Sequence, residues 1–259
     1  MKQKLILLFS SFTVIFLLTS NANATSVVLS DMPAYKWYHG CGPTAAASIF
    51  GYYDLNGYDS LFDASGWDDV RETSNVQDEI SSPAHNSKYD PQPDASGPAP
   101  PDTSIADFFH TSENQPYGWS YLSYADDAFI DYASYRGYDD WNAWNERFGT
   151  FTWDDFTKEI DNDRPMMFLI DTDADGGTDH FVPVFGYDDV AMKYACYTTW
   201  SEEEAISWRS FQDLRNSWGI GYATFVLPGV SDAVPEPATM ISLGIGLIGL
   251  SWISRKNNA

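Results

Sequence analysis

The five residues Gly-Cys-Gly-Pro-Thr at 40–44 constrain the fold of this chain more than any other stretch of its sequence. The glycines on either side of Cys41 suit a loop, Pro43 suits the first turn of a helix, and apolar residues follow at helical spacing. The sequence therefore predicts a helix that begins at Cys41. Unpaired backbone N–H groups and the positive end of the helix dipole favour a thiolate at such a position, so we expect Cys41 to be a nucleophile.

Residues 1–24 have the three parts of a secretory signal peptide. Lys2 and Lys4 make a basic start, an apolar run follows over residues 5–18, and small residues at 22–24 suit cleavage. The mature protein is therefore expected to begin near Thr25. An uncleaved N-terminal anchor is the alternative.

A second targeting segment is predicted at residues 234–259. The sequence Val-Pro-Glu-Pro at 234–237 is followed by an apolar stretch and then by Arg255 and Lys256. The stretch is at the short limit for a spanning helix, and the basic pair would stay on the cytoplasmic side. This order of features resembles a PEP-CTERM sorting tail. The resemblance implies a Gram-negative bacterium whose exosortase removes the tail and passes the protein to the cell surface or extracellular matrix, after transient membrane anchoring. An ordinary C-terminal membrane anchor is the alternative.

The segment between the two targeting signals, residues 25–233, is long enough for one domain with a sizeable core. The whole chain has 14 basic and 37 acidic residues and a formal net charge of −23. Nucleic acid is therefore excluded as a partner, because its phosphates would be repelled. Cationic substrates or calcium suit such a chain better, although solubility alone explains the charge equally well.

Helix patterns precede strand patterns along the chain, which predicts an α+β fold with helices and an antiparallel sheet segregated from each other. Residues 68–102 are polar and rich in Asp, Ser and Pro, and we interpret them as a long surface loop in which His85 is solvated. Besides the helix at Cys41, helices are expected over residues 104–110, 124–138 and 152–160, and strands over residues 165–170, 180–187, 193–200 and 222–227.

His180 stands at the start of a predicted strand, far from Cys41 in sequence. A helix-borne cysteine followed by such a histidine is the arrangement of a thiolate–imidazole pair that meets only in the folded protein. His180 would take the thiol proton and later protonate the leaving group. Cys196 is the only other cysteine. A Cys41–Cys196 disulfide is therefore the main structural alternative in an exported protein.

Two blocks of sequence resemble the papain-like cysteine peptidases, and most closely their family C-39-like, bacteriocin-processing branch. The first block is Gly-Cys-Gly-Pro-Thr with the Trp37 that precedes it, and the second runs from Asp179-His180 to Gly186-Tyr187. The resemblance implies a nucleophile helix packed on an antiparallel sheet, with Cys41 as nucleophile and His180 as general base.

The third member of the site departs from the family pattern. Such peptidases orient the imidazole with an Asp or Asn that precedes a Trp, and the matching position here is Thr198, in Tyr-Thr-Thr-Trp at 197–200. A later Asn-Ser-Trp-Gly at 216–219 has the letters of the papain-type motif. Thr198 and Asn216 are therefore both candidates, and a Thr hydroxyl would hold the ring less firmly than a carboxylate.

The oxyanion hole also departs from the pattern. Family members supply a Gln shortly before the cysteine, and residues 25–40 contain none. The backbone N–H of Cys41 remains available, joined by the indole N–H of Trp37 or by His39. His39 is also an alternative base, because it lies two residues from Cys41.

The segment at 171–179 imitates the first half of a calcium-binding loop. Asp171, Asp173, Asp175 and Asp179 offer carboxylates at alternating or nearby positions around a Gly-Gly turn. No cofactor is required by the predicted chemistry, and calcium is the one metal that the sequence suggests. The alternative is a plain acidic turn that delivers His180 to the cleft.

These features together predict a secreted cysteine peptidase that hydrolyses amide bonds of a peptide or protein substrate through a Cys41 thioacyl intermediate. Signal peptidase and exosortase would act on it during export. The competing prediction is a catalytically weak or inactive surface protein that keeps the fold as a binding module.

Overall fold

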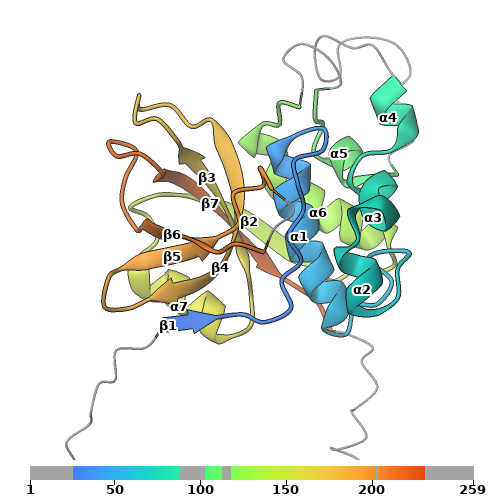
Figure 1. The fold of residues 1–259 in the computed structure, drawn as a ribbon, viewed down its shortest axis with the longest axis horizontal. Coiled ribbons are helices and arrows are strands. Elements are labelled where there is room, and N and C mark those ends of the chain that lie inside the picture. The colour runs from blue at the N-terminus through green and yellow to red at the C-terminus, as the bar shows by residue number, and fades with distance from the viewer. Residues whose placement is uncertain (1–25, 88–102, 113–117, 202–203, 231–259) are drawn as a thin grey trace, which may run out of the picture.

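The computed structural model describes residues 26–87, 103–112, 118–201 and 204–230. The predicted targeting segments at 1–24 and 234–259 lie outside these residues. Among the described residues, no helix combines the length and the apolar character needed to cross a membrane. The described part of the domain has a helical half and a sheet half, which lie side by side in Figure 1.

Helix α1 (Cys41–Leu55) stands where the two halves meet. Every residue from Gly42 to Asp54 is buried, because α1 packs on β4 and β3 on one side and on α2, α3 and α5 on the other. Three consecutive alanines, which are completely buried, keep the helix thin enough for this position. A helix that is buried on all sides fits the absence of a polar face in its sequence.

The helical half holds the remaining helices except α7 (Trp153–Asp161). It is built from α2 (Gly66–Arg71), α3 (Thr73–Ile80), α4 (Pro83–Ser87), α5 (Ile105–Phe108), the 3-10 helix η1 (Leu122–Tyr124) and α6 (Ala125–Tyr135). The helices predicted near 104–110, 124–138 and 152–160 are confirmed, although α5 is shorter than expected.

The sheet has seven strands in the order β2-β7-β3-β4-β5-β6, with β1 paired to β4, and every pairing is antiparallel. The strands are β1 (Ser26–Val28), β2 (Asn142–Arg147), β3 (Met166–Asp171), β4 (His180–Asp188), β5 (Lys193–Cys196), β6 (Ser207–Ser210) and β7 (Gly219–Leu227). The predicted α+β class is therefore confirmed, and β4 lies in the middle of the sheet.

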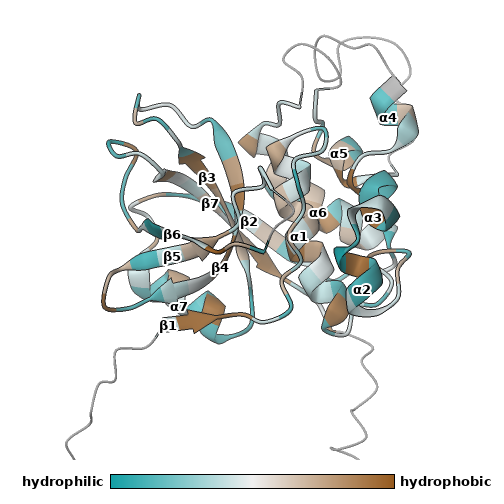
Figure 2. Ribbon diagram, in the orientation of Figure 1, coloured by the Kyte–Doolittle hydropathy of each residue, from teal (hydrophilic) through white to brown (hydrophobic). Residues whose placement is uncertain are grey.

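The prediction of a loop over 68–102 is wrong for its first part, where α2, α3 and α4 stand. Only Val70, Val76 and Ile80 are buried in α2 and α3, so the mean composition of this stretch hides its apolar face. Figure 2 shows these two helices as mainly hydrophilic. Two or three well-spaced apolar residues suffice here because α1 offers a surface on which they pack.

The expectation that His85 is solvated is also wrong. Its side chain is buried, and its Nδ1 lies 2.7 Å from an Asp107 carboxylate oxygen. Asp107 also accepts from the Ser104 backbone N–H and hydroxyl. The pair joins α4 to α5, so the polar residues of this stretch are paired inside the protein.

Strands β1, β2 and β6 were not predicted, because each is short or polar. Strand β2 has the sequence Asn-Ala-Trp-Asn-Glu-Arg and only one fully buried side chain. Its register on β7 places Trp144 opposite Phe225, and the two rings stack at a centroid distance of 5.0 Å. Such edge strands are specified by a partner elsewhere in the chain rather than by their own sequence.

Candidate active site

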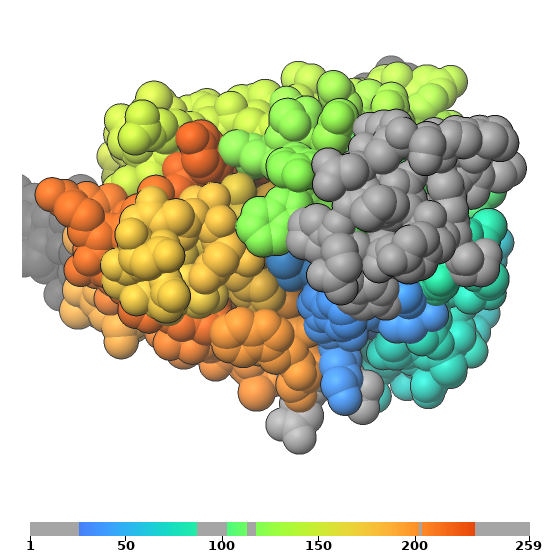
Figure 3. Space-filling model, turned by 90° about the horizontal axis from the view of Figure 1, so that it is seen from above, coloured from blue at the N-terminus to red at the C-terminus, as the bar shows by residue number. Residues whose placement is uncertain are grey.

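A cavity of about 450 Å³ opens between the two halves at the start of α1. In Figure 3 blue atoms from the start of α1 lie in a recess between green and yellow atoms. The cavity is lined by Trp37, Cys41, Gly118, Trp119, Ser120, Tyr121, Leu122, Leu169, Thr178, Asp179, His180, Phe181, Trp200 and Tyr222. Most of these side chains are aromatic or apolar, and Cys41 supplies a thiol and His180 an imidazole among them.

Cys41 is the first residue of α1, as predicted, and Gly40 caps the helix with a φ of 127°. A side chain at Gly40 would bring its Cβ to 2.7 Å from the Gly118 carbonyl oxygen, and one at Gly42 would lie 2.7 Å from the Ser120 hydroxyl. The glycines on both sides of Cys41 are thus needed because residues 118–120 pack directly on this loop. That contact brings a segment distant in sequence to the edge of the cavity.

Burial decides the protonation of Cys41. It raises the pKa of the thiol, and the opposing effect of the backbone N–H groups of Phe181, Cys41 and Gly42 is smaller. The net shift contradicts the expectation that the helix N-terminus would favour a thiolate. Cys41 is therefore a thiol at neutral pH in the free protein.

His180 is the first residue of β4, and its side chain is almost fully buried. Its Nε2 lies 2.8 Å from the Thr198 carbonyl oxygen and 3.3 Å from the Thr199 hydroxyl. A carbonyl oxygen only accepts hydrogen bonds, so Nε2 carries the proton and Nδ1 has the free lone pair. Burial lowers the pKa of His180, and the Thr198 carbonyl and Asp179 offset this only in part. The ring is therefore neutral at neutral pH and able to act as a base.

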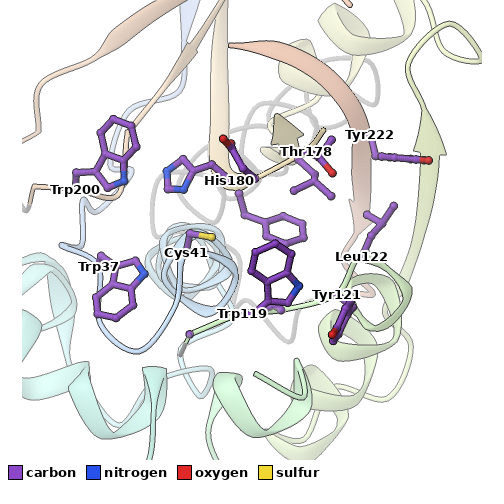
Figure 4. A pocket seen from close by; sticks show the side chains of 14 residues that line it. Trp37, Cys41, Trp119, Tyr121, Leu122, Thr178, His180, Trp200 and Tyr222 are labelled. Carbon is purple, nitrogen blue, oxygen red and sulfur yellow. The ribbon is translucent and has the colours of Figure 1, made fainter. Parts of the chain in front are cut away.

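Figure 4 shows the His180 ring directly beside the Cys41 side chain, with Trp200 and Trp37 on one side of them and Trp119, Leu122 and Tyr222 on the other. Both residues belong to the described chain, and no hydrogen bond joins the Cys41 sulfur to the ring in this structure. Contacts between nucleophile and base often tighten only when substrate binds. The arrangement places the Cys41 thiol and the neutral His180 imidazole in one cavity.

The two candidates for the orienting residue are placed differently. The Thr198 hydroxyl accepts from the Trp200 backbone N–H, and it is the carbonyl of Thr198 that contacts His180. The Asn216 side chain is exposed and donates to Asp213, so the predicted contact with His180 is absent at this described residue. Of the Asn-Ser-Trp-Gly motif, only Trp218 reaches the imidazole, edge-on at 6.4 Å between ring centroids.

Thr199 is the contact that sequence reasoning missed. It is completely buried and lies next to the candidate Thr198. The signal was present in the Tyr-Thr-Thr-Trp stretch, but the sequence does not distinguish a backbone oxygen from either hydroxyl.

Of the residues predicted to supply oxyanion donors, Cys41 and Trp37 line the cavity. Trp37 lines the cavity, and Figure 4 shows its indole beside Cys41. Its backbone N–H donates to the Thr199 carbonyl. His39, by contrast, packs edge-on against Tyr38 with a centroid distance of 4.7 Å and is not among the described residues that line the cavity. The cavity therefore favours His180 over His39 as the base.

Three of the four predicted calcium ligands come together. Carboxylate oxygens of Asp171, Asp173 and Asp179 lie within 4.8 Å of one another, whereas Asp175 is outside this group. Asp171 also accepts from the Ala174 and Gly176 backbone N–H groups, at 2.7 and 2.6 Å. These bonds organise the turn before His180 without a metal ion, and calcium binding stays a prediction.

Both cysteines are free thiols in the described structure. Cys196 is completely buried in β5, and its sulfur donates to the Ser207 carbonyl oxygen at 3.6 Å. The alternative of a Cys41–Cys196 disulfide is therefore not what the structure shows. Cys196 instead behaves as a small core residue.

Comparisons with known proteins identify the family of the chain. A family model described as the Peptidase_C39 like family matches residues 29–222, and a second, the PEP-CTERM protein-sorting motif, matches residues 233–256. Among solved structures, the chain is similar to a candidate C39-like peptidase from Bacillus anthracis, with 12% identity and a TM-score of 0.45, over 80% of this chain and 100% of the other. A comparison with curated proteins gives no match.

The first family model covers well over half of the chain, including both Cys41 and His180. The second begins only a few residues after the last described residue, Val230. Both resemblances predicted from the sequence are confirmed by these matches. The chain belongs to the Peptidase_C39 like family and carries a PEP-CTERM protein-sorting motif behind its peptidase-like domain.

Proposed function

We propose that this protein is an exported cysteine peptidase in which Cys41 attacks an amide bond and His180 transfers the protons. The observation that carries the proposal is that a thiol and an imidazole with a free Nδ1 line one cavity between the two halves of the domain. The aromatic walls of that cavity suit a peptide substrate. The PEP-CTERM motif supports sorting by an exosortase to the surface of a Gram-negative cell.

The protonation states determine how the first step runs. Because Cys41 rests as a thiol and His180 as a neutral ring, the thiol proton moves to Nδ1 as the sulfur attacks the carbonyl carbon. The backbone N–H of Cys41, at the start of α1, is a donor for the developing oxyanion. The C–N bond then breaks, His180 returns the proton to the leaving amine, and a thioester remains on Cys41.

Water completes the cycle. His180 removes a proton from the attacking water, the C–S bond breaks, and the sulfur regains its proton as the carboxylic acid product leaves. Every proton taken up by His180 is returned within the same half-reaction. No metal or cofactor is needed for either half.

A non-catalytic binding module is the second candidate, and two observations favour it. The raised pKa of the Cys41 thiol and the lack of the family's Gln both weaken the nucleophile relative to a thiolate–imidazolium pair. Losing one oxyanion donor typically costs about 10²–10³ in turnover. Such a loss would leave a peptide-binding cleft with little hydrolysis.

Labelling with a thiol-directed epoxide, followed by mass-spectrometric mapping, separates the two candidates. For an enzyme we expect an adduct at Cys41 whose formation falls strongly in His180→Ala. Cys196 is the internal control, because a completely buried thiol should stay unlabelled. An inert Cys41, or equal labelling with and without His180, contradicts the proposed peptidase.

A further inference from the structure

We propose that the turn at Thr198 and Thr199 orients the His180 imidazole, with Thr199 as a positioning residue that takes the place of the family's Asp or Asn side chain. This inference rests on the proposed function, since it concerns the base of that same site. It goes beyond the resemblance, which pointed to the Thr198 hydroxyl or to Asn216.

The Nε2 of His180 has two hydrogen-bond acceptors, one from Thr198 and one from Thr199. Its strongest acceptor is the Thr198 carbonyl oxygen, at 2.8 Å, and the Thr199 hydroxyl is a second acceptor at 3.3 Å. Both oxygens accept the same N–H, so they fix one tautomer of the neutral ring. That tautomer has its lone pair on Nδ1, the nitrogen that a base for Cys41 needs.

The backbone of Thr199 has an unusual conformation. Its φ is 59°, in the left-handed region that a β-branched residue rarely adopts, and it is completely buried. Such a conformation is strained for a β-branched residue and persists only where the surroundings impose it. The chain bends at this residue, and two carbonyls and the Thr199 hydroxyl contact His180 and Trp37, which line the cavity.

The turn at Thr198 and Thr199 contacts both the loop before Cys41 and the ring of His180. The Thr199 carbonyl accepts from the Trp37 backbone N–H, four residues before Cys41, while the Thr198 carbonyl accepts from His180. Trp200 follows at once and covers the imidazole, with ring centroids 4.9 Å apart and planes tilted by 30°. One short turn thus contacts the loop of the nucleophile and the ring of the base.

A backbone carbonyl differs from a side-chain partner because substitution of the residue does not remove it. A substitution at 198 leaves the carbonyl in place, so the identity of the Thr198 side chain should matter little. The side chain of Thr199 should affect the orientation of the imidazole more, because its hydroxyl contacts the ring and its backbone conformation shapes the turn. A neutral acceptor also stabilises an imidazolium less than a carboxylate would.

Four variants test the inference through the rate of epoxide labelling at Cys41 at neutral pH. We expect Thr199→Val, which keeps the shape and removes the hydroxyl, to slow labelling by about tenfold, in the range usual for lost outer-shell partners. Thr199→Ser restores the hydroxyl and should recover most of the rate. Thr198→Val keeps the carbonyl that contacts His180 and should slow labelling less than Thr199→Val does, and His180→Ala sets the rate without the base.

The outcomes separate this inference from the proposed function. If His180→Ala labels as fast as the unaltered protein, the proposed peptidase fails. If His180→Ala is slow but Thr199→Val is not, or if Thr198→Val is as slow as Thr199→Val, the positioning role of Thr199 is overturned while the peptidase stands.

Nitrogen-15 NMR of the His180 imidazole reports the tautomer directly, which a merely structural role of Thr199 would not set. It is measured on the unaltered protein, so it does not depend on the folding of a variant. We expect the unaltered protein to show His180 as the neutral tautomer protonated at Nε2. A ring protonated at Nδ1 overturns the inference, even if Thr199→Val proves too unstable to assay.

Discussion

At the scale of single residues, the proposed chemistry depends on burial more than on the helix dipole. Cys41 stands at a helix N-terminus, where a thiolate is favoured, yet burial has the larger effect and raises the pKa of the thiol. The same burial lowers the pKa of His180. The two shifts act in opposite directions on the two groups, and both favour the neutral pair over a thiolate–imidazolium pair.

The neutral state of the pair leads to a prediction of the pH range in which the Cys41 thiolate forms. Because the pKa of Cys41 is raised from the ordinary value of 9.0, its thiolate should be absent at neutral pH and appear only above pH 9. The measurement is the ultraviolet absorbance of the thiolate across a pH titration, with Cys41→Ser subtracted as the blank. Thiolate absorbance already present near pH 7 would show an ion pair and contradict the prediction.

At the scale of elements, the start of α1 depends on its contact with the 118–122 segment. Gly42 is the second residue of the helix, where alanine would ordinarily be favoured. A Cβ there would lie 2.7 Å from the Ser120 hydroxyl oxygen and 3.0 Å from the Ser120 Cβ. The packing at this position therefore outweighs helix propensity.

We expect Gly42→Ala to destabilise the fold by about 1–3 kcal/mol, as overpacking does, and to slow the labelling of Cys41. Thermal unfolding and epoxide labelling measure the two effects. Ser120→Gly removes the atoms that the new Cβ meets, so the double variant should recover part of both losses. Additive losses in the double variant would show that the contact with Ser120 is not the cause.

At the scale of the whole molecule, the cavity and the last described residue, Val230, lie at opposite ends of the domain. Helix α1 runs from the cavity, at the top of Figure 1, to the foot of the domain, a length of about 22 Å. Near its C-terminal end, the Tyr58 hydroxyl donates to the Gly229 carbonyl, and the Val230 N–H donates to Asp140 at 2.9 Å. The last described residues, Gly229 and Val230, are therefore held far from Cys41.

This geometry predicts that attachment through the C-terminus leaves the site accessible. Protein immobilised through residues beyond 230 should label at Cys41 within about twofold of the rate in solution, even with a bulky epoxide, because an exposed cleft keeps its diffusional access. Protein immobilised through position 119, on the cavity rim, is the control and should label more slowly. Protection in the C-terminal attachment would contradict the prediction.

Much of this architecture is local, and the sequence alone determined it. The glycines and proline around Cys41 define where a helix begins, the apolar run after His180 defines a strand, and the order of helices before strands defines the α+β class. The PEP-CTERM motif is likewise recognisable from composition and order. These features depend on backbone preferences and periodicity, which neighbouring residues settle among themselves.

Only the tertiary structure decided what those elements do to one another. It placed a backbone carbonyl and the Thr199 hydroxyl on His180 where the sequence offered Thr198 and Asn216. It also stabilised α2 and α3 by giving their buried residues Val70, Val76 and Ile80 a surface on which to pack. It also buried Cys41 enough to keep it a thiol. Burial and contact between distant segments depend on how whole elements pack, and that information is not contained in any single stretch of the chain.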